Sequence, residues 1–107
     1  NPASRADFTL LNSLPPVRLD TTLTVEESDG ETSVTAEISN PTNHLAFQIQ
    51  LALMNEVDGL ELGPVYWEEN FFSLLPGETR HVRAVLPSAE LDGKKPLLRA
   101  GGWNIVP

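Results

Sequence analysis

The sequence predicts an all-β protein built as an antiparallel β-sandwich of about seven strands. Apolar and polar residues alternate with a period of two along most of the chain, turn residues separate the alternating runs, and no stretch shows a helical period. Each such run buries one face, so the strands must pair into two layers that cover each other. The length of 107 residues suits one sandwich. We expect a domain over residues 14–107, preceded by a linker or edge segment over residues 1–13.

The N-terminal part predicts an extended segment followed by a strand. Residues 8–14 form a short apolar run that ends at Pro15-Pro16, where two backbone donors are missing, so we expect an edge strand or an extended segment there. Residues 19–27 alternate more clearly and predict a strand with one wet face. Its core face carries Leu19, Leu23 and Val25.

The next segment predicts the second arm of a hairpin. Ser28-Asp29-Gly30 is expected to form the turn, because an Asp-Gly pair accepts the positive φ values of tight hairpin turns. The return strand covers residues 31–39 and stops at a loop over residues 40–43. Its alternation places three residues on the core side, namely Val34, Ala36 and Ile38.

Residues 45–53 show the most regular alternation in the chain and predict a central strand of an antiparallel sheet. The predicted core face carries Leu45, Phe47, Ile49, Leu51 and Leu53. The predicted opposite face carries Ala46, Gln48, Gln50 and Ala52. A turn-rich acidic connection over residues 56–63 follows.

Residues 64–80 hold four of the seven aromatic side chains. We expect strands over residues 65–67 and 71–75, with a polar step between them. Pro76-Gly77 then suits the two central positions of a type II turn, because proline fixes a negative φ and glycine accepts a positive one.

This aromatic cluster (Tyr66, Trp67, Phe71 and Phe72) has two interpretations. We favour a place in the sandwich core, because aromatic side chains bury large areas. The alternative is an exposed platform of Tyr66 and Trp67 that stacks on a sugar ring. In that case the sugar hydroxyls would bond to the residues of the polar step, which are Glu68, Glu69 and Asn70.

The C-terminal third predicts two more strands, over residues 78–86 and 97–106, with a single helical turn or a loop over residues 88–91. The inward-facing residues of the first strand are Val82, Ala84 and Leu86. In the last strand Gly101-Gly102 marks a bulge or a close backbone approach. Trp103 beside it is either an apolar anchor or a contact with a neighbouring domain.

Charge and composition argue against several classes of partner. Acidic residues outnumber basic ones 15 to 7, giving a formal net charge of −8, and the basic residues form no dense run. Such a surface repels phosphate, so we expect no nucleic-acid or membrane partner. The absence of cysteine excludes disulfides and thiolate metal sites and leaves the compartment open.

The sequence contains no recognisable catalytic constellation. Glycosidic cleavage by a carboxylate pair needs two acids on opposite sides of one bond, whereas Glu68 and Glu69 are adjacent and would point to opposite faces of an extended strand. Gly-x-Ser-x-Gly is absent, and the two histidines, His44 and His81, fall in a predicted loop and on an outward strand face. We expect no catalytic residue and no cofactor.

Metal binding has only a weak signal, in the acidic connection. Asp58, Glu61 and carbonyl groups near Gly59 offer the oxygen ligands that calcium prefers, but their spacing matches no established loop pattern. We favour solvated surface acids and expect no metal site.

A resemblance to a known family rests on three segments of the chain, which are ISNPTNHLAFQIQLAL, GPVYWEENFFSLLPGETRHVRAVLP and KPLLRAGGWN. With them the chain resembles the C-terminal immunoglobulin-like domain of glycoside hydrolase family 2 enzymes, and the nearest types are exo-β-glucosaminidases and β-mannosidase-like members. The similarity covers about residues 14–104 and is strongest from Tyr66 to Glu78. Because the cysteine pair of antibody domains is missing, only the immunoglobulin-like architecture is implied.

The resemblance implies a role by position. In such enzymes the acid/base and nucleophile glutamates belong to a separate (β/α)-barrel domain, and β-sandwich domains flank the barrel as scaffold and sometimes shape the entrance to its active site. The chain would then be a non-catalytic part of a bacterial-type glycosidase, secreted or periplasmic. The family-like structural positions are Tyr66, Trp67, Asn70, Phe71 and Phe72.

Three functional hypotheses follow from these patterns. The favoured one is an accessory domain, monomeric on its own, that contacts sister domains or an oligosaccharide. A carbohydrate-binding module would use the same aromatic rings as a stacking platform. An adhesion or interaction sandwich would need an unpaired edge strand that accepts a strand from a partner. The proposed contact residues are Tyr66, Trp67, Glu68, Glu69, Asn70 and Trp103.

Overall fold

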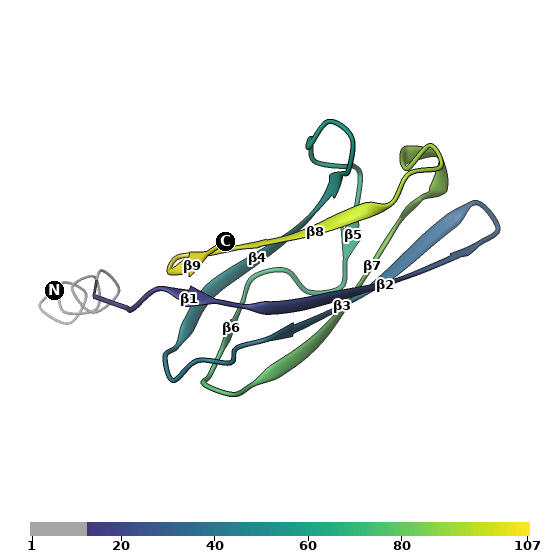
Figure 1. Cartoon of the computed structure of the whole chain (residues 1–107). Helices are drawn as coiled ribbons and strands as arrows, with labels where there is room; N and C mark the ends of the chain where they lie inside the picture. Colours follow the sequence, from purple (N-terminus) through teal and green to yellow (C-terminus); the bar gives the residue numbers. More distant parts are fainter. Residues whose placement is uncertain (1–12) are drawn as a thin grey trace, which may run out of the picture.

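The computed structural model describes residues 13–107, which form a β-sandwich (Figure 1). One antiparallel sheet has the order β2 (Asp20–Ser28), β3 (Glu31–Ser39), β7 (Thr79–Pro87) and β5 (Tyr66–Trp67). The second has the order β6 (Phe72–Leu74), β4 (Ala46–Asn55) and β8 (Pro96–Gly101). A short parallel pair joins β1 (Val17–Arg18) to β9 (Ile105–Val106). The seven strands of the two sheets confirm the predicted all-β sandwich.

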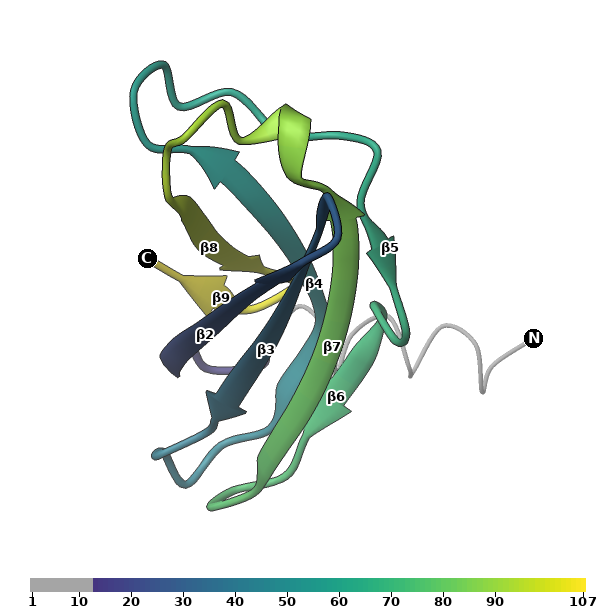
Figure 2. The ribbon, with the colours of Figure 1, turned by 90° about the vertical axis from the view of Figure 1, so that its right-hand side faces the viewer.

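The core lies between the two sheets, which face each other in Figure 2. The predicted inward faces of β3 and β7 are confirmed, because each of these side chains is at most 1% exposed: Val34, Ala36, Ile38, Val82, Ala84 and Leu86. The second sheet contributes buried aliphatic residues from β4 and β6, and β4 is its central strand as predicted. The predicted segment over residues 8–14 falls largely on residues 1–12, outside the described part.

Both predicted turns are present. Asp29 and Gly30 have φ values of 54° and 77°, so the β2–β3 hairpin closes with two residues in the left-handed region, as a type I′ turn requires. Gly77 has a φ of 76°, and the N–H of Glu78 donates to the carbonyl of Leu75 at 3.0 Å, which closes the predicted type II turn. The predicted helical turn is a 3-10 helix, η1 (Ser88–Glu90).

A β-bulge interrupts β4, where the alternation in the sequence gave no sign of one. Ala46 pairs with Leu74, but the next pair joins Ile49 to Phe72, so β4 has one residue more than β6 over this interval. The backbone of Gln48, within this interval, adopts a left-handed conformation with a φ of 51°.

The bulge reverses which side chains of β4 face the core. Ala46, predicted to point outward, is completely buried, whereas Leu45 and Phe47, predicted to point inward, are only half-buried. Beyond the bulge the predicted inward residues are correct, since Ile49, Leu51 and Leu53 are at most 2% exposed, but Ala52, predicted on the opposite face, is also buried at 8% exposed. The prediction of one unbroken face was therefore wrong at the start of the strand, because a single inserted residue changes the parity of all that precede it.

The apolar side chains of the predicted strand over residues 19–27 are less buried than their alternation predicts. These side chains were expected on the core side, yet Leu19 and Leu23 are half-buried and Val25 is 45% exposed. The physical reason is position, because β2 is an outer strand of its sheet and its inner face has only β8 opposite it.

The predicted last strand is divided in two. β8 ends at Gly101 and β9 begins at Ile105, with Trp103 and Asn104 in a turn between them. The predicted close backbone approach is confirmed at Gly102, where a Cβ atom would lie 2.8 Å from the carbonyl oxygen of Gln48. The β4 bulge and the β8–β9 turn thus pack directly against each other. No helix in the described part has the length and apolarity needed to cross a membrane.

Candidate functional site

The predicted contact residues lie at two places on the sandwich. Tyr66 and Trp67 form β5, and residues 68–70 form the step that leads into β6. Trp103 belongs to the β8–β9 turn and is 48% exposed. The contact set predicted from the sequence therefore does not form one continuous site.

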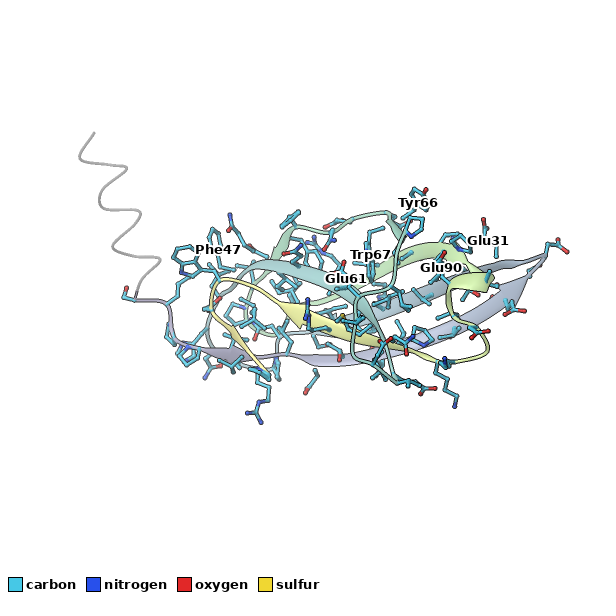
Figure 3. All side chains as sticks on the ribbon, turned by 90° about the horizontal axis from the view of Figure 1, so that it is seen from above. Glu31, Phe47, Glu61, Tyr66, Trp67 and Glu90 are labelled. Atoms are coloured by element: carbon cyan, nitrogen blue, oxygen red, sulfur yellow. The ribbon has the colours of Figure 1, made fainter. Side chains whose placement is uncertain are left out.

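The aromatic cluster divides evenly between core and surface. Trp67 packs against both groups of buried core residues, and Phe72 is only 7% exposed. Tyr66 and Phe71 are 67% and 71% exposed. In Figure 3 Tyr66 projects away from the body of the domain, whereas Trp67 lies over it. The core interpretation therefore holds for Trp67 and Phe72, whereas the platform interpretation needs both Tyr66 and Trp67 exposed and only Tyr66 is.

The two glutamates of the polar step are both engaged by β7. Glu68 accepts a hydrogen bond from the backbone N–H of Arg83 at 3.3 Å, and Glu69 forms an ion pair with Arg80. The Arg80 guanidinium also lies 5.0 Å from the centre of the Phe72 ring. The expectation that these glutamates point to opposite faces assumed an extended strand, whereas residues 68–70 form an irregular step.

Asn70 acts as a substitute for a missing strand residue. Its side-chain oxygen accepts the N–H of Leu51 at 2.7 Å, and its side-chain nitrogen donates to the carbonyl of Leu51 at 3.2 Å. These are the two bonds that a paired residue of a neighbouring strand would make. Asn70 thus extends the β4–β6 ladder by two residues beyond the Ile49–Phe72 pair.

Replacing Asn70 by alanine is expected to lower the free energy of unfolding by about 1–2 kcal/mol, because one N–H and one carbonyl of β4 lose their partner. Urea unfolding of the chain followed by tryptophan fluorescence measures this change. The exposed Asn43, for which the same substitution should have almost no effect, is the matched control. Equal stability of the two variants would contradict the structural role of Asn70.

Two further asparagines carry structural roles that the sequence analysis did not assign. Asn104 is 8% exposed; it accepts the N–H of Phe47 at 2.8 Å and donates to the carbonyls of Pro15 at 2.8 Å and Leu45 at 2.6 Å. Asn40 is 1% exposed, and its amide nitrogen donates to the carbonyl of His44 at 2.7 Å. Both lie in motifs that the sequence shows, Gly-Trp-Asn and Asn-Pro-Thr-Asn.

The described surface offers little that could support catalysis. Asp29, Glu31 and Tyr66 border a shallow depression of about 230 Å³ on the outside of β5 and β7. In residues 13–107 no three His, Cys, Asp or Glu side chains gather where they could hold a metal ion. In the connection that was considered for calcium, Asp58 accepts the N–H of Leu60 at 2.9 Å and so stabilises the local turn.

Comparison with known proteins gives consistent matches over almost the whole chain. Residues 1–105 match the family model described as the exo-β-D-glucosaminidase Ig-fold domain. The exo-β-D-glucosaminidase of Amycolatopsis orientalis is 34% identical over 102 residues, which cover 92% of this chain and 10% of that protein. The exo-β-D-glucosaminidase of Arthroderma benhamiae is 31% identical over 102 residues, which cover 94% of this chain and 10% of that protein.

Solved structures agree with these matches. The crystal structure of Amycolatopsis orientalis exo-chitosanase CsxA superposes with a TM-score of 0.82 at 33% identity, over 89% of this chain and 11% of that one. A complex of the same enzyme with PNP-β-D-glucosamine gives a TM-score of 0.84 at 33% identity, over 94% of this chain and 12% of that one. The chain thus spans about a tenth of the length of the curated relatives it matches.

Proposed function

The chain belongs to the family of exo-β-D-glucosaminidase Ig-fold domains, and we propose that it supports the catalytic barrel of such an enzyme from outside, as a non-catalytic accessory domain. One observation carries this proposal: almost the whole chain aligns with about a tenth of relatives that bear the name of one enzyme. The substrate of the parent is then a β-linked glucosamine unit at the end of a chain, as the names of the relatives say.

The interior of the domain supports a mechanical role. Two of its buried polar residues, Asn40 and Asn104, bond to backbone groups far away in the sequence, and the buried hydroxyl of Thr32 bonds to that of Ser88 at 2.7 Å. In residues 13–107 no buried side-chain nitrogen or oxygen lacks a partner. A sandwich held in this way presents fixed surfaces to neighbouring domains, and this is what a scaffold requires.

The contacts to sister domains are part of the proposal. Tyr66 and Trp103 are suited to them because about half or more of each side chain is exposed. Trp67, Glu68, Glu69 and Asn70 also remain in the proposed contact region, although their main partners are residues of the sandwich itself. Contacts near the barrel entrance would let the domain influence which substrates enter.

A Gly102→Ala variant of the full-length enzyme tests the scaffold role. We expect its half-life at elevated temperature, measured as loss of aryl β-D-glucosaminide hydrolysis, to shorten by about threefold or more, because unfolding of the accessory domain releases the barrel. The initial rate at 25 °C should stay within about twofold of the parent enzyme. Gly101→Ala is the control. An unchanged half-life, in a variant whose accessory domain demonstrably melts at lower temperature, would refute the scaffold role.

A second candidate function is carbohydrate binding, which the exposed Tyr66 ring favours. Tyr66 lies beside Asp29 and Glu31, and carboxylates attract the protonated amino groups of glucosamine polymers. Titration calorimetry with chitosan oligosaccharides tests whether the domain binds carbohydrate, and mannan and xylan oligomers serve for comparison. Heat that disappears in a Tyr66→Ala variant would establish this function, and no heat with any oligomer removes it.

A further inference from the structure

The two sheets are open towards solvent along one side, between β2 and β8. In the described part β2 pairs with β3 alone and β8 with β4 alone, so both are outer strands, and they contact each other across the sandwich. Two depressions of about 500 and 450 Å³ lie along this side. We call it the β2/β8 opening and define it by its apolar residues, which are Leu19, Leu23, Val25, Leu98, Ala100 and Ile105.

The β2/β8 opening is apolar because side chains of the core face reach solvent there. Val25 is 45% exposed, and the other five residues are only half-buried although they pack against the core. The alternation in β2 is that of a strand with one covered face, yet nothing in residues 13–107 covers it fully. An apolar strip that follows the strand period and remains exposed is typical of a surface that binds another protein surface.

The charges around the β2/β8 opening differ from those of the rest of the domain. The chain has a net charge of −8 and only seven basic residues, yet Lys94 and Lys95 line one depression and Arg99 the other. The lining of the two depressions includes one acidic residue, Glu27. Arg80 on β7 is paired with Glu69, and Lys94 lies within ion-pair distance of Asp92. The nearest acid to Lys94 is Asp92 at 3.9 Å, and that carboxylate is 89% exposed. A basic rim on an acidic domain favours a partner with carboxylates and disfavours a cationic amino sugar.

We propose that the β2/β8 opening is the surface by which this domain docks on another domain of its own polypeptide, and that the docked surface carries apolar side chains with carboxylates beside them. This inference rests on the proposed accessory role. The partner is argued from the relatives, because the part of them that matches this chain is 10% of their length and the remainder belongs to the same molecule. Burial of Leu23 and Val25 would complete the apolar face that the sequence of β2 encodes.

Cysteine labelling of the full-length enzyme tests the docking surface. The matched probes are Val25→Cys in the β2/β8 opening and Val57→Cys on the exposed loop before β5, since both replace an exposed valine. Maleimide labelling is followed on the individual peptides by mass spectrometry, with the denatured enzyme as reference. We expect labelling at Val25→Cys to be at least about tenfold slower than at Val57→Cys, because it requires transient undocking.

A charge reversal tests the acidic nature of the partner. Lys94→Glu combined with Lys95→Glu should raise the labelling rate at Val25→Cys about threefold or more and leave Val57→Cys unchanged. A rise of similar size is expected in high salt, because salt screens the same attraction. Labelling that does not respond to either change would overturn the assignment of carboxylates to the partner.

The outcomes separate this inference from the proposed function. If Val25→Cys labels as fast as Val57→Cys while Tyr66→Cys is protected, the domain docks through another face and this inference is wrong. If Val25→Cys, Tyr66→Cys and a Trp103→Cys variant all label as fast as Val57→Cys, none of the proposed contacts is covered and the accessory role fails as well. Protection at Val25→Cys that is lost on dilution of the enzyme indicates a second copy of the chain as the occupant, and this also overturns the inference.

Discussion

An Asn104→Ala variant of this chain is expected to lose about 3 kcal/mol of its free energy of unfolding. The substitution removes three hydrogen bonds at once and leaves the N–H of Phe47 and the carbonyls of Pro15 and Leu45 without partners in a largely buried position. An unpaired buried polar group costs more than a hydrogen bond contributes, because it has also lost water. The measurement is urea unfolding at constant m-value.

Two further variants make the Asn104 experiment specific. Asn104→Asp keeps the acceptor for Phe47 but loses both donors and places a carboxylate against two carbonyl oxygens, so it should be at least as destabilised. Asn43→Ala, at an exposed loop position, should change stability by less than about 0.5 kcal/mol. A stable Asn104→Asp variant would show that the two carbonyl contacts contribute little.

Replacing Gly102 by alanine is expected to cost about 2–3 kcal/mol. The added Cβ would lie 2.7 Å from the Cγ1 of Ile105, 2.8 Å from the carbonyl oxygen of Gln48 and 3.1 Å from that of Phe47. Ile105 can turn aside, but the two carbonyls belong to the β4 bulge, so the backbone itself must move. Thermal unfolding followed by circular dichroism measures the loss.

Gly101 provides the matched control for Gly102. It is the adjacent residue, its φ is not positive, and an added Cβ would have no atom within 4 Å. Gly101→Ala should therefore be neutral or slightly stabilising, by up to about 1 kcal/mol through the loss of freedom in the unfolded chain. If both alanine variants are equally destabilised, close packing at Gly102 is not the cause.

Most of the fold follows from local patterns in the sequence. The Asp29-Gly30 pair determines its hairpin, and the Pro76-Gly77 pair determines its turn, because each needs only the φ preferences of two residues. The alternation in β3 and β7 predicts their buried faces correctly because both strands are internal and regular. Where one strand geometry holds over nine residues, the period of two is sufficient.

The β4 bulge could not be predicted from the segment that contains it. Leu45 to Leu53 alternates without fault, and an extra residue is visible only against the partner strand. The groups that hold the bulge come from elsewhere: Asn104 accepts the N–H of Phe47, and Ser73 accepts the N–H of Gln48. These bonds join residues 57 and 25 positions apart, beyond the reach of any local pattern.

The candidate site was predicted in part. The aromatic segment marked an important region, but exposure of Tyr66 and burial of Phe72 depend on which face each presents to the opposite sheet. The resemblance made Asn70 a structural position and the platform interpretation made it a sugar contact; only the position of β4 shows what its structural role is, the two bonds to Leu51. The residue types therefore identified the important segment, whereas the contacts of each side chain depend on how the strands pair in the folded domain.

The central claim is that this chain is an accessory domain without catalytic groups of its own. The most direct test is to assay the purified 107-residue chain with p-nitrophenyl β-D-glucosaminide. A circular dichroism spectrum typical of β-structure and a cooperative unfolding transition establish that the chain is folded in the assay. We expect no release of p-nitrophenol above the buffer rate, while the full-length enzyme hydrolyses the compound under the same conditions. Turnover that copurifies with the folded chain and changes when its acidic residues are substituted would contradict the claim.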